Sequence, residues 1–200
     1  MRYLTLILFV VCTSYSQTQE LYDIAFSKKE NFRVLTFMGG KIPKTFYVKD
    51  STDFINGAIF YLPDTDLNDP EVMKGIEHDE HHPYHNVYLF ADKSLDTLIP
   101  KQEKIKLAAV ADNSVVTKIN ITGKKFKMID TFKKEGFYFL LTNPIYSSDG
   151  RYAFARISVK QKTTFLGDPW DEYFATITFM FEKMQDGKWK QIGRKDHIIL

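Results

Sequence analysis

The last third of the chain consists largely of aromatic and β-branched runs whose apolar residues recur at every second position. This spacing puts alternate side chains on opposite faces of a strand, and it limits the choice of fold more than any other feature. In the longest run, Ala175, Ile177 and Phe179 share one face. The expected strands are Phe137–Leu141, Tyr152–Lys160, Tyr173–Met184 and Trp189–Ile192. Short turns separate the later strands at residues 147–150 and 186–187, so we expect an antiparallel C-terminal β-meander.

The rest of the chain predicts short helices and further strands. Leu21, Ile24 and Ala25 have helical spacing and predict a helix over Gln19–Lys28. Further expected elements are strands at Arg33–Met38, Thr45–Lys49 and Asn86–Ala91, a two-residue hairpin at Asn56-Gly57, and a helix from Asp69 that ends by His82. Pro100–Ala111 fits a helix or a strand. We therefore expect a single α+β domain over residues 17–200, with the meander packed against one or two short helices.

Residues 1–16 have the layout of a secretory signal peptide. Arg2 precedes an apolar run from Leu4 to Val11, and small residues occupy the positions one and three before a cut after Ser16. The run is eight residues long, far shorter than the roughly 20 residues of a membrane-spanning helix. We expect an exported protein, periplasmic or secreted, with no transmembrane anchor after cleavage.

Cys12 supports a minor alternative, because bacterial lipoproteins are cut and acylated at a cysteine behind an apolar run. Such sites have a small residue directly before the cysteine, whereas Val11 stands there in this chain. Cleavage after Ser16 would leave no cysteine, since Cys12 is the only one. The mature chain would then have neither a disulfide nor a cysteine nucleophile.

The near-neutral net charge of +2 conceals an uneven distribution. Residues 62–92 contain 1 basic and 8 acidic side chains, whereas residues 93–134 contain 10 basic and 4 acidic ones. Six lysines of the basic part are interleaved with Phe126 and Phe132; they are Lys118, Lys124, Lys125, Lys127, Lys133 and Lys134. An exported protein of balanced charge is not expected to bind nucleic acid. We expect a solvated lysine face that contacts lipid or an acidic partner, if it contacts anything. The alternative is that the acidic part of the chain pairs with these lysines within the fold.

The acidic part contains the one concentrated set of metal-ligating side chains. Four of the five histidines lie within residues 77–85. The candidate metal ligands are His78, His81, His82, His85, Glu77 and Glu80. Imidazole and carboxylate groups suit zinc and other divalent ions, and an exposed histidine-rich loop can bind one without a preformed cavity. The alternative is a solvated loop that binds nothing.

Two short motifs resemble known metal sites and depart from them. Residues 78–82 resemble the metalloprotease helix of the zincins, with Asp79 in place of the catalytic glutamate. Residues 64–69 resemble the start of an EF-hand loop, but Asp69 stands where that loop requires glycine. We expect neither activity from them.

Other catalytic signatures are missing from the sequence, which holds no serine-nucleophile motif and no phosphate-binding glycine loop. Residues 168–172 set Trp170 beside carboxylates, an arrangement that suits a sugar or a tryptophan that caps the core. We expect no catalytic residue and no cofactor, with zinc or another divalent metal as the alternative.

The C-terminal segment resembles a group of small exported proteins of Bacteroidetes-type bacteria. The shared pattern is Thr142-x-Pro144-Ile145-Tyr146-Ser147-x-Asp149 entering a strand, followed by a hairpin that ends in Gly187-Lys188-Trp189. The signal peptide ending in Ser-Gln is similar too. This resemblance implies an envelope or secreted location and an α+β fold, and it carries no catalytic residue. The hairpin also resembles the closing strands of nuclear-transport-factor-like cone folds.

These observations lead to three function hypotheses. The first is an exported, non-enzymatic binding or accessory protein of the envelope or extracellular space, whose partner is a protein or a small ligand. The second is a divalent-metal-binding protein, or a metal-dependent hydrolase, that uses the histidine cluster. The third is an immunity or inhibitor protein that binds a partner through the acidic stretch from Asp64 to Glu80.

Overall fold

The computed structural model describes residues 17–37, 40–61, 88–166 and 168–199. Residues 17–27 form an α-helix, as the apolar spacing around Leu21 and Ile24 predicts. The elements that follow are η1 (Lys29–Thr36), β1 (Phe46–Lys49), η2 (Gly57–Ile59), η3 (Leu89–Ala91), α3 (Lys93–Asp96), α4 (Lys101–Asp112), β2 (Phe126–Ile129), β3 (Gly136–Leu141), β4 (Ile145–Tyr146), β5 (Tyr152–Phe165), β6 (Asp168–Lys183) and β7 (Trp189–Ile198).

The described strands form one mixed sheet in the order β2-β1-β3-β5-β6-β7, and β4 also pairs with β5. β1 runs parallel to both β2 and β3, whereas β5, β6 and β7 pair antiparallel with their neighbours. The α+β class is confirmed, and the expected C-terminal strands pair antiparallel, but the sheet as a whole is mixed because β1 adds two parallel pairs. A parallel pair needs a long crossover, and the chain between β1 and β2 supplies one that contains α4.

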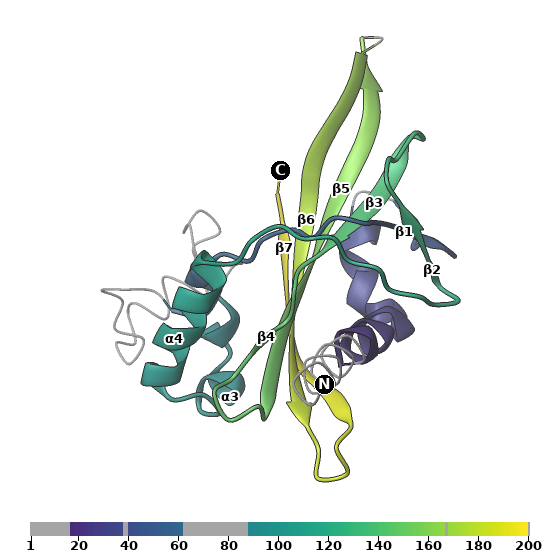
Figure 1. Cartoon of the computed structure of the whole chain (residues 1–200). Helices are drawn as coiled ribbons and strands as arrows, with labels where there is room; N and C mark the ends of the chain where they lie inside the picture. The colour runs from purple at the N-terminus through teal and green to yellow at the C-terminus, as the bar shows by residue number, and fades with distance from the viewer. Residues whose placement is uncertain (1–16, 38–39, 62–87, 167, 200) are drawn as a thin grey trace, which may run out of the picture.

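The sheet is packed on both faces (Figure 1), with the helix over residues 17–27 and η1 on one side and α3 and α4 on the other. We call the side chains between the sheet and the N-terminal helix the first layer, and those between the sheet and α4 the second layer. Because successive side chains of a strand point to opposite faces, β5 and β6 contribute to both layers. Ala153, Ala155 and Ile157 of β5 face the N-terminal helix, while Phe154 packs with α4 and its surroundings. Ala175, Ile177 and Phe179 of β6 lie together in the first layer, as their spacing predicts.

The first layer is rich in phenylalanine. Phe26 from the helix, Phe32 from η1, Phe46 from β1 and Phe139 from β3 meet with ring centroids 4.4–6.4 Å apart. Edge and tilted contacts of this kind stabilise a core beyond the area that it buries. These four side chains therefore fasten the N-terminal elements to the parallel edge of the sheet.

A β-bulge changes the faces of β6 near residue 174. The register shifts so that Val159 pairs with Ala175 while Lys160 pairs with Tyr173, which leaves Phe174 as the extra residue. Phe174 and Ala175 both lie in the first layer, and Tyr173 turns to the opposite face. Bulges commonly re-aim a side chain in this way.

Three sequence-based element predictions are wrong in the described residues. Residues 33–37 are not a strand, because burial from Asn31 to Phe37 follows a period near three that suits the 3-10 helix η1. The Asn31 side chain donates to the carbonyl oxygen of Ala25 and to Gln191. These contacts fix the turn after the N-terminal helix and override the local strand preference.

The other two errors concern short segments near α4. Asn56-Gly57 is no hairpin, because Asn56 has extended backbone and its side chain caps η2 by accepting from Ala58. Residues 89–91, the described end of the predicted strand Asn86–Ala91, form the 3-10 helix η3. The ambiguous stretch Pro100–Ala111 is helical, with Pro100 directly before α4. Among the described helices, none is long and apolar enough to cross a membrane.

Gly57 gives a test of the packing between η2 and α4. A Cβ at this position would lie 2.7 Å from the carbonyl oxygen of Ala108 and 2.5 Å from the Asp112 carboxylate. We expect Gly57→Ala to lower the free energy of unfolding in urea by about 1–3 kcal/mol. The exposed substitution Val116→Ala should change it by less than about 0.5 kcal/mol. Equal effects of the two substitutions would refute the close packing.

Candidate functional site

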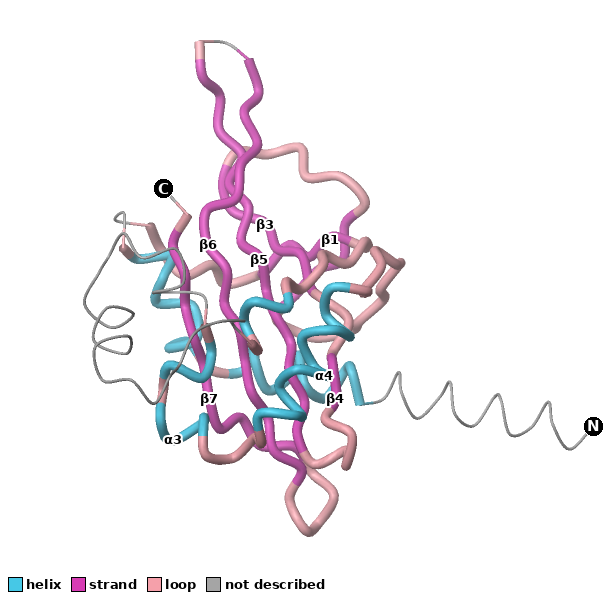
Figure 2. Tube along the Cα trace, turned by 90° about the vertical axis from the view of Figure 1, so that its left-hand side faces the viewer, coloured by secondary structure: helices cyan, strands magenta, loops and turns pink. Residues whose placement is uncertain are grey.

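On the face of the sheet that α3 and α4 cover in part, the uncovered portion carries polar side chains. Figure 2 shows the helices over the lower part of this face, while β5 and β6 continue above them. The side chains that meet there come from the 50–60 loop and from β3, β5, β6 and β7. We call this set the polar face; it consists of Asp53, Tyr138, Arg156, Ser158, Lys160, Asp171, Tyr173 and His197.

Asp53 is the centre of the polar face. Its backbone N–H donates to Leu141 of β3, and its buried carboxylate accepts from the Ser158 hydroxyl at 2.5 Å and from the Tyr173 hydroxyl at 3.3 Å. The same carboxylate also accepts from the backbone N–H of Phe54. A buried carboxylate is tolerated only when it is hydrogen-bonded in this way. Asp53 therefore ties the 50–60 loop to β3, β5 and β6.

Arg156 adds a positive charge beside this carboxylate. One Nη atom donates to the carbonyl oxygen of Phe54 at 2.7 Å, and its backbone N–H donates to the Thr142 hydroxyl. Burial lowers the pKa of Arg156, while the charge of Asp53 acts in the opposite direction. The guanidinium thus helps to compensate Asp53 and holds the same loop.

A second set of contacts links β3 to the outer part of β6. The Tyr138 hydroxyl donates to the Asp171 carboxylate at 2.8 Å, and the Lys160 ammonium lies 3.4 Å from that carboxylate and 4.5 Å from the Tyr173 ring centre. Burial and the Asp171 carboxylate both raise the pKa of Tyr138. At neutral pH Tyr138 is therefore a neutral hydrogen-bond donor.

Together these contacts tie the 50–60 loop to the strands β3, β5 and β6, and we call them the platform. Ser158 is fully buried, so its hydroxyl cannot reach a substrate although it is bonded to a carboxylate. Nucleophilic catalysis needs an accessible nucleophile with a base beside it. Asp53, Asp171, Tyr138 and Tyr173 are occupied with one another or with neighbouring strands, and their role is to hold the sheet and the loop in place.

The basic edge of the sheet is the largest concentration of charge in the described residues. We define it as residues 40–50 and 117–135, which carry β1 and β2. It contains nine lysines against three acidic residues; the lysines are Lys41, Lys44, Lys49, Lys118, Lys124, Lys125, Lys127, Lys133 and Lys134. All except Lys49 are exposed. No ion pair among the described residues involves any of the nine.

An aromatic row joins the basic edge to the polar face. Tyr47 of β1 lies 5.6 Å from Phe132, and Phe132 lies 5.2 Å from Tyr138, measured between ring centres. The Lys134 ammonium lies 5.7 Å from the Tyr47 ring centre, and Lys162 donates to the carbonyl oxygen of Phe132. The expected interleaving of lysine and phenylalanine holds for Phe132, whereas Phe126 is buried in the first layer.

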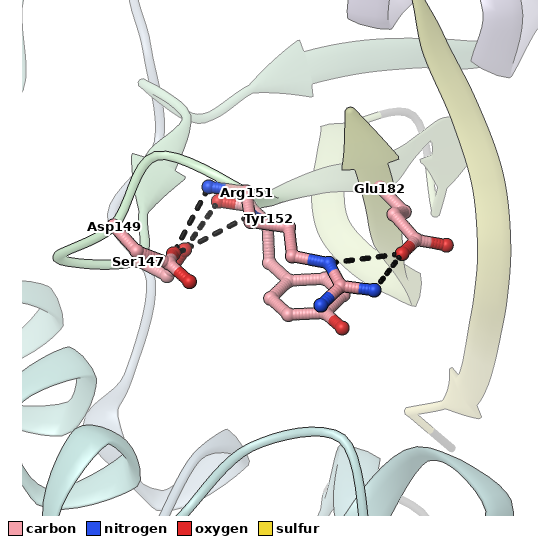
Figure 3. A network of polar contacts seen from close by, with 5 residues as sticks. All are labelled: Ser147, Asp149, Arg151, Tyr152 and Glu182. Carbon is pink, nitrogen blue, oxygen red and sulfur yellow. Dashed lines mark hydrogen bonds and ion pairs between the residues drawn. The ribbon is translucent and has the colours of Figure 1, made fainter. Parts of the chain in front are cut away.

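The motif that carries the resemblance to exported proteins is a turn (Figure 3). Ser147 donates to Asp149 at 2.5 Å, Asp149 accepts from the backbone N–H of Arg151, and the Arg151 guanidinium pairs with Glu182 at 2.7 Å. Gly150 supplies the positive φ of 69° that the turn requires. The hydrogen bond from Ser147 lowers the pKa of Asp149. These residues build the connection between β4 and β5 and tie it to β6.

The metal ligands expected from the sequence lie outside the described residues. This holds for His78, His81, His82, His85, Glu77 and Glu80, for the EF-hand-like residues 64–69, and for the acidic stretch from Asp64 to Glu80. The described part of the chain contains no group of three or more metal-ligating side chains. Residues 1–16, with Cys12 and the expected cleavage site, are likewise not described.

Trp170 does not cap the core. It lies in β6 with 55% of its surface exposed, and its ring N–H donates to Glu172. The part of β6 from Asp168 to Glu172 was missed by a strand prediction that began at Tyr173. The β-branched Thr163 and Thr164 opposite it are the sequence signal that could have extended both strands.

The described hollows lie elsewhere. One, of about 350 Å³, is lined by η1 and the end of β7 and includes Arg33, Phe37 and Asp196. Burial raises the pKa of Asp196, but its carboxylate is paired with Arg194 at 3.1 Å. Another hollow follows one face of the helix over residues 17–27. The second hollow is lined by this one helix alone, and in the first the Asp196 carboxylate is already paired, so the exposed charge of the basic edge is the stronger candidate.

Replacement of Asp53 tests how much its carboxylate contributes to the stability of the fold. Asp53→Ala removes the acceptor of Ser158 and Tyr173 and leaves Arg156 without its counter-charge. We expect the free energy of unfolding to fall by about 2–4 kcal/mol. Asp168→Ala, which removes an exposed carboxylate from the same sheet, should have little effect. A small effect of Asp53→Ala would show that the loop is held by other contacts.

The pH dependence of stability tests the environment of His197. Burial and the nearby Arg156 charge lower the pKa of His197 below its ordinary value of 6.5. The unfolded chain therefore binds a proton at His197 more readily than the folded chain does. The stability that neutral, buried His197 contributes is complete above pH 6.5 and is lost as the pH falls below it. In urea unfolding at neutral pH and at about pH 5, His197→Gln should lose less stability on acidification than the parent. Identical pH profiles would contradict this environment.

Comparison of the chain with protein-family models, with curated proteins and with solved structures finds no match. The function therefore rests on the chemistry of the surface itself.

Proposed function

We propose that the protein is an exported, non-enzymatic binding protein that holds an acidic ligand at its basic edge. The observation that carries the proposal is the set of nine lysines without ion-pair partners among the described residues. Export rests on the signal-peptide layout of residues 1–16. The periplasm or the outside of the cell is where such a protein would meet its ligand.

Ion pairs among the described residues do not neutralise this concentration of positive charge. The basic edge has an excess of six positive charges, while the whole chain has a net charge of only +2. Like charges on one surface repel one another and are stabilised by water or by an oppositely charged partner. An acidic ligand would relieve this repulsion and release counterions, and both effects favour binding.

The aromatic row makes the edge suitable for contact. Tyr47 and Phe132 are half-buried, so their rings are held in place while part of each stays accessible. The platform around Asp53 and Arg156 supports β3 and β5 behind them. A rigid surface loses little entropy on binding.

The burial and the hydrogen bonds of the potentially reactive side chains support a non-enzymatic role. Ser158 is inaccessible, and the carboxylates of Asp53 and Asp171 are used within the protein. The described polar groups therefore serve stability, and the exposed lysines serve attraction. The metal-binding hypothesis depends on residues 77–85, and no described contact adds support to it.

Retention on immobilised heparin, a sulfated polyanion, tests the proposal. We expect the variant with Lys127→Glu, Lys133→Glu and Lys134→Glu to elute at clearly lower salt than the parent. The slope of log affinity against log salt concentration should fall by about 3, one for each lysine that contacts the polyanion. Circular dichroism checks that the variant is folded.

The control variant carries Lys101→Glu, Lys106→Glu and Lys188→Glu. These exposed lysines lie outside the basic edge, and the change in net charge is the same. The control should elute close to the parent. If both variants lost retention equally, binding would depend on total charge and the proposed edge would be wrong.

A further inference from the structure

The β5–β6 hairpin extends beyond the rest of the sheet (Figures 1 and 2). The last pair between β3 and β5 is Gly136 with Lys162, and the last pair between β6 and β7 is Ala175 with Ile198. From Thr163 in β5 and up to Trp170 in β6, the described residues of the two strands pair only with each other. We call residues 163–166 and 168–170 the arm; its pairs run from Thr163 with Trp170 to Phe165 with Asp168.

The exposed end of the arm is apolar. Leu166 is 90% exposed, the highest value among the large hydrophobic side chains described, and Trp170 is also largely exposed. Asp168 is the one charged residue within the arm. Apolar side chains this exposed at a projecting tip indicate a contact that the isolated protein does not make.

The backbone conformation at Leu166 is unfavourable for a leucine. It has a φ of 52°, in the left-handed region that favours glycine and asparagine over leucine. A polar asparagine would suit both this backbone conformation and the exposure to water. Neither folding nor solubility therefore accounts for leucine at the tip.

The lysines nearest the arm surround its base. Lys162 donates to the carbonyl oxygen of Phe132 in the β2–β3 loop, which also carries Lys133 and Lys134. Leu166 lies four residues beyond Lys162, a distance of roughly 13 Å at about 3.3 Å per strand residue. A peripheral element enters a bilayer by roughly 5–10 Å. If the tip enters to this depth, the lysines lie at the level of the headgroups.

We propose that the arm inserts into the surface of an anionic lipid bilayer while the lysines of the basic edge contact its headgroups. This rests on the proposed function, because it names the acidic ligand as the membrane surface. Tryptophan is favoured at the membrane–water interface, and lysine is attracted to anionic lipid. The charge excess of the edge complements such lipids, and the tip supplies the apolar part of the contact.

Strand addition by a second copy is less suited to the arm. Pro169 has no N–H to donate to an added strand, and antiparallel self-pairing of β6 would bring Asp168, Asp171 and Glu172 close to their own copies. Insertion needs neither a free strand edge nor a self-complementary sequence.

Vesicle binding by the protein recovered from the envelope or medium of an expressing bacterium tests the inference. Its N-terminus is recorded by mass spectrometry. Vesicles of phosphatidylethanolamine with phosphatidylglycerol are compared with vesicles of phosphatidylcholine alone. We expect binding to the first and about tenfold or more weaker binding to the second.

The tip variants separate insertion from simple charge attraction. Leu166→Asn should weaken binding to the anionic vesicles by about tenfold while the protein stays at least as stable as the parent. Val115→Asn, at another exposed apolar position, is the matched control and should leave binding unchanged. In a Trp189→Phe background, the fluorescence of Trp170 should shift to the blue on binding and be quenched by brominated lipid chains.

The outcomes are distinguishable from those of the heparin experiment. Retention on heparin without binding to either vesicle would overturn membrane insertion and leave the proposed function intact. Loss of both would overturn both. Vesicle binding that Leu166→Asn does not weaken, or Trp170 fluorescence that does not change, would show that the arm stays outside the bilayer.

Discussion

The structure depends on the pairing of β5 with β6, two strands buried on both faces over much of their length. To the layer beneath the N-terminal helix, β5 contributes alanines and branched residues and β6 contributes three phenylalanines with Ala175 and Ile177. The layer beneath α4 receives Tyr152 and Phe154 from β5 and Met180 from β6. Neither layer would form without the other, because a sheet exposes its second face unless something covers it. The parallel strands β1 and β2, the polar face and the basic edge are all positioned by attachment to this pair.

Sequence periodicity identified this pair and the helix over residues 17–27, because their patterns are long and regular. It failed where tertiary contacts decide the backbone. Asn56-Gly57 has a strong hairpin preference, yet Gly57 is required for the close approach to α4. Arg33–Met38 has strand-like residues, but Asn31 and the buried Phe32 hold the part up to Thr36 as the 3-10 helix η1.

The candidate surface was predictable only in part. The lysines were visible as a charge excess, and their place on an edge followed once β1 and β2 were known to pair in parallel. Asp53 gave no signal, since a single carboxylate in a loop is unremarkable until Ser158 and Tyr173 are seen to bond to it. The bulge at Phe174 also hid the true direction of Tyr173, because one extra residue reverses the alternation on which such predictions depend.

The continuity of the arm with the central strands has a mechanical consequence. A pull along the arm from its tip acts directly on β5 and β6, with no flexible linker to absorb it. Force along paired strands is shared by many hydrogen bonds at once, and here those bonds are shielded by two apolar layers. The exposed Leu166 is therefore joined, through continuous strands, to the part of the described sheet that is buried between both apolar layers.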